Sequence, residues 1–208
     1  NLEYDSVILH CDQALERYPN QALLYFYNGV AYYSKKEFEM AIRFLSYGRK
    51  YVGDPNLLEF FYAQLGDAHN ALEQHTQSDE AYEKALELNP SNEHVLNNYS
   101  YFLCLRKQQL LKAQDMAKKL IQKHPENATY LDTYGWVLYT MKQYEEAEIY
   151  LKKAALIDEN GTVIEHYGDV LFELGKFKEA LTQWIRAKEL GGTTDSIGLK
   201  ITNSEIHD

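Results

Sequence analysis

The chain has 208 residues and a formal net charge of −10, from 31 Asp and Glu against 21 Lys and Arg. Binding to a phosphate backbone requires concentrated positive charge, so this balance argues against a nucleic-acid partner. No apolar run approaches the ~18 residues that a membrane helix needs, so the sequence predicts no direct membrane span. The two cysteines, Cys11 and Cys104, lie far apart in the chain, and we expect no disulfide between them.

Taken in chain order, the apolar periodicity predicts a series of amphipathic helices joined by short turns. Single expected helices cover residues 2–18, 21–34, 37–51, 56–71, 76–88, 92–105 and 194–201, and whole helix pairs are expected at about 127–160 and 161–190. The scarcity of Pro, with four in the whole chain, and the lack of Gly/Ser-rich linkers favour one continuous array.

Local signals mark several of the helix ends. Residues 53–55 indicate an extended loop between two helix pairs. Pro90 disfavours helix at the residue before it, so the preceding helix is expected to end at Leu88, before Asn89. Ser91 is then expected to cap the helix that follows.

The first and last expected helices lie outside the complete pairs. Residues 2–18 have the pattern of the second helix of a pair whose first helix is missing. Ala14 belongs to the same periodic series as residues of the later second helices. We therefore expect an upstream repeat, a signal sequence or a lipid anchor before residue 1 in the natural protein. At the other end, residues 194–201 are expected to cover the last apolar edge with Ile197 and Ile201.

Small residues recur at a nearly constant interval along the chain. In the first helix of each pair they are separated by 37, 34, 35 and 33 residues, and a second, out-of-phase series keeps the same interval in the second helices. A small residue lets two helix backbones approach where a branched side chain would separate them. The two series are Gly29, Gly66, Ser100, Gly135 and Gly168, and Ala41, Ser78, Ala113, Ala147 and Ala180.

This pattern resembles the tetratricopeptide repeat (TPR) family, over roughly residues 7 to 192. The match consists of a bulky residue before Gly in helix A, a bulky residue in helix B and a Pro after the pair. The residues that carry it are Leu65-Gly66, Tyr134-Gly135 and Tyr167-Gly168, then Tyr82, Leu151 and Trp184, then Pro19, Pro90 and Pro125.

The resemblance implies an all-α, right-handed superhelical solenoid of antiparallel helix pairs. We expect a single solenoid over residues 1–192 and a short capping helix or tail over 193–208. The expected repeats are a partial one at 1–19 and full ones at about 20–53, 56–90, 91–126, 127–160 and 161–190. The pattern lapses at Asn28, Gly48, Ala117 and Leu120, where looser packing is expected.

In this family the A helices line a concave groove, and stepping at helical spacing from each small residue gives the side chains expected there. The expected groove consists of Phe26, Val30, Tyr33, Gln64, Asp67, Asn70, Asn97, Asn98, Tyr101, Asp132, Trp136, Tyr139, Glu165, Asp169 and Phe172.

The composition of this expected groove suits a peptide ligand. Asn and Gln offer both a donor and an acceptor to a peptide backbone, the aromatic rings offer flat apolar contact, and the acids would favour basic groups. Two alternatives remain: the rings pack between helices, or the acids are ordinary solvated residues. A clamp of Lys, Arg and Asn for a C-terminal carboxylate is disfavoured, because no Lys or Arg falls at the expected groove positions.

An enzymatic role has no support in the residue pattern. No HExxH or CxxC motif occurs, and the glycines are single rather than grouped in a phosphate-binding loop. His166 beside Glu165 is interpreted as a groove or packing residue. We therefore expect no catalytic residues, no metal and no cofactor.

The sequence thus favours a non-enzymatic scaffold that binds an extended peptide or helix of another protein in the groove. The alternative is an assembly module that stacks through its terminal helices, by self-association or on further repeats. The unequal repeats are similar to those of bacterial cell-envelope TPR proteins, which suggests a periplasmic or outer-membrane-associated location.

Overall fold

The computed structural model describes the backbone of residues 2–205 and the side chains of residues 2–202, and within this range it is all-α. Residue 1 and the end of the expected tail, residues 206–208, lie outside the described part. The α-helices are α1 (Leu2–Arg17), α2 (Ala22–Ser34), α3 (Phe38–Gly48), α4 (Pro55–Ala71), α5 (His75–Leu88), α6 (Glu93–Leu105), α7 (Leu110–Lys123), α8 (Ala128–Thr140), α9 (Tyr144–Ile157), α10 (Gly161–Glu173), α11 (Phe177–Leu190) and α12 (Ile197–Glu205), and a 3-10 turn, η1 (Arg49–Tyr51), extends α3.

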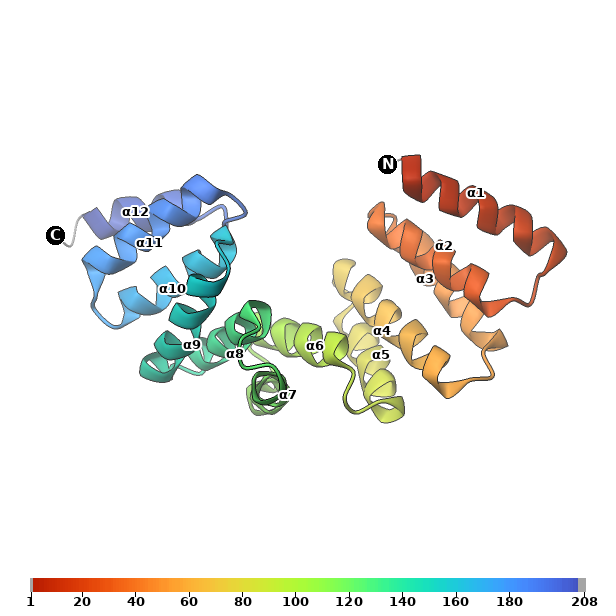
Figure 1. Cartoon of the computed structure of the whole chain (residues 1–208), viewed down its shortest axis with the longest axis horizontal. Helices are drawn as coiled ribbons and strands as arrows, with labels where there is room; N and C mark the ends of the chain where they lie inside the picture. Colours follow the sequence, from red (N-terminus) through yellow and green to blue (C-terminus); the bar gives the residue numbers. More distant parts are fainter. Residues whose placement is uncertain (1, 206–208) are drawn as a thin grey trace. The chain divides into compact units, whose positions relative to one another are not determined.

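Successive helices form antiparallel pairs, such as α2 with α3 and α10 with α11, and each pair packs on the next within its part of the chain (Figure 1). The expected all-α class of stacked helix pairs is therefore confirmed. Within residues 2–205, no helix is both long and apolar enough to cross a bilayer.

The turns inside the pairs share one backbone conformation. A residue with positive φ follows each A helix, and the next amide donates to a carbonyl five residues back, as in Glu37 N to Tyr32 O at 2.9 Å. This is the hydrogen bond that closes a helix at a left-handed residue. The expected insertion at residues 106–109 adds a second such residue, Gln109, with φ of 45°. The series of left-handed residues is Lys36, Glu73, Lys107, Lys142 and Gly175.

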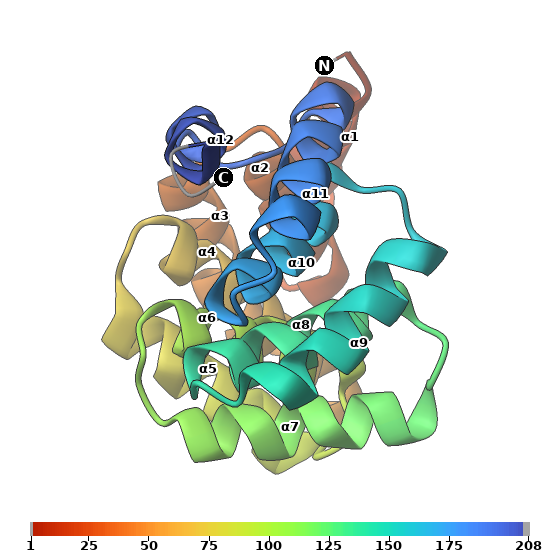
Figure 2. The same ribbon diagram turned by 90° about the vertical axis from the view of Figure 1, so that its left-hand side faces the viewer.

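The chain divides into two compact units, residues 1–99 and 100–208, with the boundary inside α6. The core of unit 1 contains Leu45 and Phe61, both fully buried. The core of unit 2 contains Leu151 and Trp184, and α12 adds Ile197 and Ile201 to it. Figure 2 shows α12 lying beside α11. Ile197 and Ile201 are the residues expected to face this core, and the helix that carries them begins three residues later than predicted.

The glycines of the A helices face bulky residues of the B helices. A Cβ added at Gly66 would lie 2.5 Å from the ring of Tyr82, and one at Gly168 would lie 2.5 Å from the ring of Trp184. Only a residue without a side chain fits these contacts, which explains the recurrent small residue.

Two local predictions are wrong. Packing is not looser at Gly48, because a Cβ there would lie 2.2 Å from the Cβ of Tyr25, so the glycine permits a closer approach of α3 to α2. Ser91 does not cap α6; instead the side chain of Asn92 accepts from the amide of Val95 at 2.9 Å, while the hydroxyl of Ser91 donates to Asn89. Ala117 and Leu120, where loosening was also expected, are both fully buried.

Candidate functional site

The residues expected to bind a peptide lie on the A helices of both units. We call these two sets the A-helix face of unit 1 and the A-helix face of unit 2. The first contains Phe26, Val30, Tyr33, Gln64, Asp67, Asn70, Asn97 and Asn98; the second contains Tyr101, Asp132, Trp136, Tyr139, Glu165, Asp169 and Phe172.

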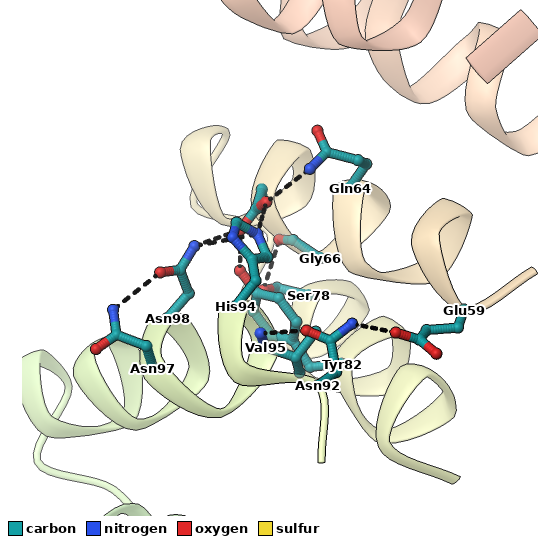
Figure 3. A network of polar contacts seen from close by, with 11 residues as sticks. Glu59, Gln64, Gly66, Ser78, Tyr82, Asn92, His94, Val95, Asn97 and Asn98 are labelled. Atoms are coloured by element: carbon teal, nitrogen blue, oxygen red, sulfur yellow. Dashed lines mark hydrogen bonds and ion pairs between the residues drawn. The ribbon is translucent and has the colours of Figure 1, made fainter. Parts of the chain in front are cut away.

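On the A-helix face of unit 1, polar side chains converge on the buried carboxylate of Asp67. Figure 3 shows the side chains of Gln64, His94 and Asn98 pointing toward one another. The hydroxyl of Tyr82 donates to Asp67 Oδ1 at 2.6 Å, and the amide of Asn98 donates to the same atom at 3.0 Å. His94 Nε2 lies 2.6 Å from Asp67 Oδ2, and the amide of Gln64 is 3.4 Å from that atom. Asp67 therefore links α4 to α5 and to the start of α6.

The electrostatics of this network centre on His94. Its hydrogen bond to Asp67 raises the pKa of the imidazole above its usual range, against the opposing effect of burial. The imidazole is half exposed, so solvent reaches the pair. A second link between the same elements is formed by Glu59, whose carboxylate accepts from the amides of Asn92 and Asn89.

The other residues of the A-helix face of unit 1 are not part of this network. Phe26 packs against Phe61 with ring centroids 5.2 Å apart, and Tyr33 packs against Phe38 at 5.4 Å. Asn97 donates to Asn98 at 3.2 Å, which connects it to the edge of the network. These side chains of the A-helix face are half-buried, and so are Val30 and Asn70.

On the A-helix face of unit 2, Trp136 forms an ordered aromatic surface. Its ring is nearly parallel to that of His166, with centroids 3.9 Å apart, and to that of Tyr139, with centroids 4.6 Å apart. His166 is held in place by Asp132, which lies 2.9 Å from its Nδ1. Trp136 and Tyr139 are half-buried, so part of this surface faces solvent. Burial raises the pKa of Tyr139, which keeps its hydroxyl protonated.

The acids at the far end of unit 2 are bound by a lysine of the same chain. Lys200 on α12 donates to Glu165 at 2.6 Å and to both oxygens of Asp169 at 2.7 Å. Glu165 also accepts from the amide and hydroxyl of Thr194, and Asp169 accepts from Trp184 Nε1 at 2.9 Å. The interpretation of these acids as solvated surface residues is wrong, because both are buried.

The two carboxylates respond differently to this environment. Burial raises the pKa of Glu165, but the hydrogen bonds from Lys200 and Thr194 outweigh it, so the pKa lies below its usual range. For Asp169, burial outweighs the lysine and the pKa is raised. Phe172, the last predicted residue, packs on Trp184 at 5.5 Å, and Tyr101 on Phe102 at 6.0 Å.

Sequence reasoning missed His94 and Lys200. The signal that would have found Lys200 is the repeat itself, because Asn98 lies 31 residues after Asp67 and Lys200 lies 31 residues after Asp169. Extending the repeat by one helix beyond residue 192 places Lys200 in phase with Asn98. The offset of 15 from each acid to the bulky donor, Tyr82 or Trp184, is also the same in both units.

Nothing in this arrangement supplies a metal centre or an activated nucleophile within the described residues. Among the side chains of residues 2–202, no group of three or more His, Cys, Asp or Glu is placed to hold a metal ion. Cys104 is buried, and burial raises the pKa of its thiol to about 11, so the reactive thiolate is disfavoured.

Comparison with known proteins gives a consistent family. The family model described as tetratricopeptide repeat matches residues 61–92 and 128–160. A TPR repeat-containing protein of Pseudomonas aeruginosa, PA4667, is 29% identical over 152 residues, which cover 72% of this chain and 25% of that protein. The chain thus spans about a quarter of the length of this relative.

Solved structures share the fold. The pilus biogenesis factor PilW superposes with a TM-score of 0.76 at 17% identity, covering 88% of this chain and 86% of that one. YrrB, described as a TPR protein with an unusual peptide-binding site, gives a TM-score of 0.68 at 15% identity, covering 93% and 97%. At these identities the likeness concerns the fold.

Proposed function

The chain belongs to the tetratricopeptide repeat family, whose fold is a protein–protein interaction scaffold, and on this premise we propose that it binds an extended segment or a helix of a partner protein along its A-helix faces. TPR proteins are typically non-enzymatic scaffolds, and we propose a binding role without catalysis. The residues proposed to contact the partner are those of the two A-helix faces defined above.

The observation that carries the proposal is the surface made by Trp136, Tyr139 and His166. These rings are already stacked, and His166 is held by Asp132, so they lose little side-chain entropy when a ligand covers them. Tyr and Trp are also enriched among the residues that dominate binding energy at interfaces. On the A-helix face of unit 1, half-buried side-chain amides such as those of Gln64 and Asn97 offer donors and acceptors to a peptide backbone.

The four acids of the A-helix faces are buried, and each already has a partner within the chain. We therefore propose that affinity comes mainly from aromatic and amide contacts, with basic groups of the partner contributing little.

Site-specific photocrosslinking tests this function. A photoreactive benzoylphenylalanine replaces Tyr139 in one variant and Ile149, an exposed residue of α9, in the control. In a native lysate of the source organism, we expect the Tyr139 probe to crosslink a defined protein that the Ile149 probe does not reach. Trp136→Ala in the first variant should weaken the affinity about thirtyfold and lower the crosslink yield accordingly, because an interface aromatic contributes about 2 kcal/mol. Equal crosslinking from both positions would contradict the proposal.

A second candidate function is self-assembly through the terminal helices. Its support is the exposure of apolar side chains on α1, where Leu2 is 91% and Leu9 is 55% exposed. Light scattering at rising protein concentration tests it: the mass of the parent should increase toward a dimer and that of Leu9→Asp should not. A constant monomer mass for the parent would reject it.

We also propose a bacterial envelope location. Its support is the likeness to PilW, which is described as a type IV pilus biogenesis factor, and to the Pseudomonas aeruginosa relative. Fractionation of the source cells tests this location directly.

A further inference from the structure

A hollow of about 810 Å³ opens on unit 1 between α1, α2, α3 and the 3-10 turn η1. Both α1 and α3 pack against α2, and the hollow lies above α2. We call it the α1–α3 hollow. Its volume is within the range of natural ligand sites. Its lining consists of Asp12, Tyr25, Tyr32, Met40, Arg43, Phe44, Ser46, Tyr47, Arg49 and Lys50.

The hollow lies on a different side of α2 from the A-helix face. Tyr25 and Tyr32 are seven residues apart and share one stripe of the helix, whereas Phe26 and Tyr33 share the next. Adjacent residues of a helix are separated by about 100° around its axis. A ligand in the hollow therefore does not occupy the A-helix face of unit 1.

Aromatic rings form the walls of the hollow, and they are fixed by contacts with one another. Tyr25 lies 5.1 Å from Tyr47 between ring centroids, and Tyr32 stacks on Phe44 at 5.2 Å. The hydroxyl of Tyr25 donates to the carbonyl of Pro19 at 2.8 Å, which fixes its ring. These walls suit an apolar or aromatic side chain of a ligand.

Three cations surround these rings, and only one carboxylate lines the hollow with them. Arg43 and Lys50 are exposed, and Arg49 is half-buried over the ring of Tyr62 at 5.4 Å. Among residues 2–202, none of the three pairs with a carboxylate. The one acid of the lining, Asp12, already accepts from the amide of Asn28 at 2.8 Å.

This local charge is opposite to that of the whole chain. The protein carries a net charge of −10, yet the hollow has three cations to one acid. Arg beside Tyr and Phe matches the composition of protein interfaces, where Arg binds carboxylates through two parallel hydrogen bonds. A basic partner would be repelled here, and a purely apolar partner would form no ion pair with the three cations.

We propose that the α1–α3 hollow binds an acidic segment of a partner protein. An aromatic or aliphatic side chain of that segment lies against Tyr25, Phe44 and Tyr47. Flanking Asp or Glu residues pair with Arg43, Arg49 and Lys50. The hollow is thus a second recognition surface, separate from the A-helix faces and of opposite charge preference.

Selection from a phage-displayed peptide library tests the proposal with the whole chain as bait. We expect enriched peptides to combine Asp or Glu with one aromatic or aliphatic residue. Their affinity, measured by fluorescence anisotropy, should fall about tenfold or more in the double variant Arg43→Glu, Lys50→Glu, since charge-assisted hydrogen bonds are lost. Affinity should also weaken as salt is raised, because exposed charges are screened.

Two control variants separate this site from a general charge effect. Lys118→Glu with Lys119→Glu makes the same charge change at exposed positions of α7 and should leave the affinity unchanged. Arg43→Lys with Lys50→Arg keeps the charge and should retain most of the affinity. Circular dichroism checks that each variant is folded.

Three outcomes would overturn the proposal. The first is enrichment of basic or uncharged peptides only, or of none. The second is equal affinity of the acidic peptides for the parent and the Arg43→Glu, Lys50→Glu variant. The third is that a labelled single-stranded oligonucleotide, measured in parallel, binds the hollow with the same variant dependence and the peptides do not. Failure of the Tyr139 crosslinking would leave this proposal unaffected, because the two surfaces are separate.

Discussion

Asp67 in unit 1 and Asp169 in unit 2 occupy the same place in their repeats. Each follows a glycine in an A helix, accepts from a bulky B-helix residue 15 positions later, and accepts from a residue 31 positions later in the next A helix. The difference lies in the last partner, which is the neutral amide of Asn98 in one case and the ammonium of Lys200 in the other. The acid joins successive repeats in both units, but only unit 2 does so with a full ion pair.

This comparison shows how one repeat position supports two kinds of connection. In unit 1, Asp67 also meets His94, whose charge depends on pH and whose imidazole is half exposed, and the half-buried amide of Asn98. In unit 2, Lys200 joins two buried carboxylates, so removing the lysine leaves two buried acids without a counter-charge, and removing either acid breaks one of its two ion pairs. The junction of α10 with α12 should therefore be the less tolerant of the two.

Removing the acids tests this difference most directly. Asp169→Ala should lower the free energy of unfolding by about 3 kcal/mol, because it breaks a buried ion pair and leaves Trp184 Nε1 without its acceptor. Asp67→Ala should cost about 2 kcal/mol, since two partners of Asp67, His94 and Asn98, are partly hydrated. Urea unfolding of both variants measures the costs. A larger cost for Asp67→Ala would contradict the expectation that the junction of α10 with α12 is the less tolerant one.

The glycines before the two acids should behave alike, in contrast to the acids. Gly168→Ala and Gly66→Ala each place a Cβ 2.5 Å from a buried ring, so each should destabilise by about 1–2 kcal/mol even though Ala is the better helix former. Thermal unfolding of the two variants measures this, with Gly198→Ala on α12 as the control, where a Cβ meets nothing within 4 Å. A stabilised Gly66→Ala would show that the ring of Tyr82 moves aside at no cost.

The smallest expected difference is the pH dependence of unit 1. The pKa of His94 is raised in the folded state, so its stabilisation is fully present below the unfolded value near 6.5 and is lost as pH rises through the folded pKa. Solvent screening limits the effect to a few tenths of a kcal/mol. The difference in unfolding free energy between the parent and His94→Gln should shrink as pH rises from the unfolded to the folded pKa of His94. Hydrogen exchange of α12, which reports on the Lys200 contacts, should stay unchanged over the same pH interval. A difference that grows with pH would contradict the assignment.

Periodicity predicted the helix pairs because a small residue must recur wherever two helices approach closely, as at Gly66 and Gly168. The helix ends were harder to predict, because both Ser91 and Asn92 are good capping residues and the choice depends on tertiary contacts with Glu59. The partners of the acids were harder still. Lys200 lies beyond the last complete pair, so stepping within the five repeats did not reach it.

The α1–α3 hollow could not be predicted from the pattern of the repeats. Its walls come from residues that the repeat uses for packing, such as Tyr25, and from cations such as Arg43 that have no fixed place in the repeat. Their convergence depends on how α1 and α3 lie on α2. Whether the A-helix residues bind a ligand stays a prediction, and so does the division of the chain into one solenoid with a terminal cap.

The left-handed turns inside the pairs offer a route to engineered thermostability. Four of the five carry Lys or Glu at a conformation that costs an L-residue about 1 kcal/mol, and all four side chains are exposed. Replacing each with Gly removes this strain. Gly also raises the conformational entropy of the unfolded chain, which costs less than the strain that is removed. The four turns lie in different helix pairs, so their gains should add. The positions concerned are Lys36, Glu73, Lys107 and Lys142, and none of them lies on the A-helix faces or in the α1–α3 hollow.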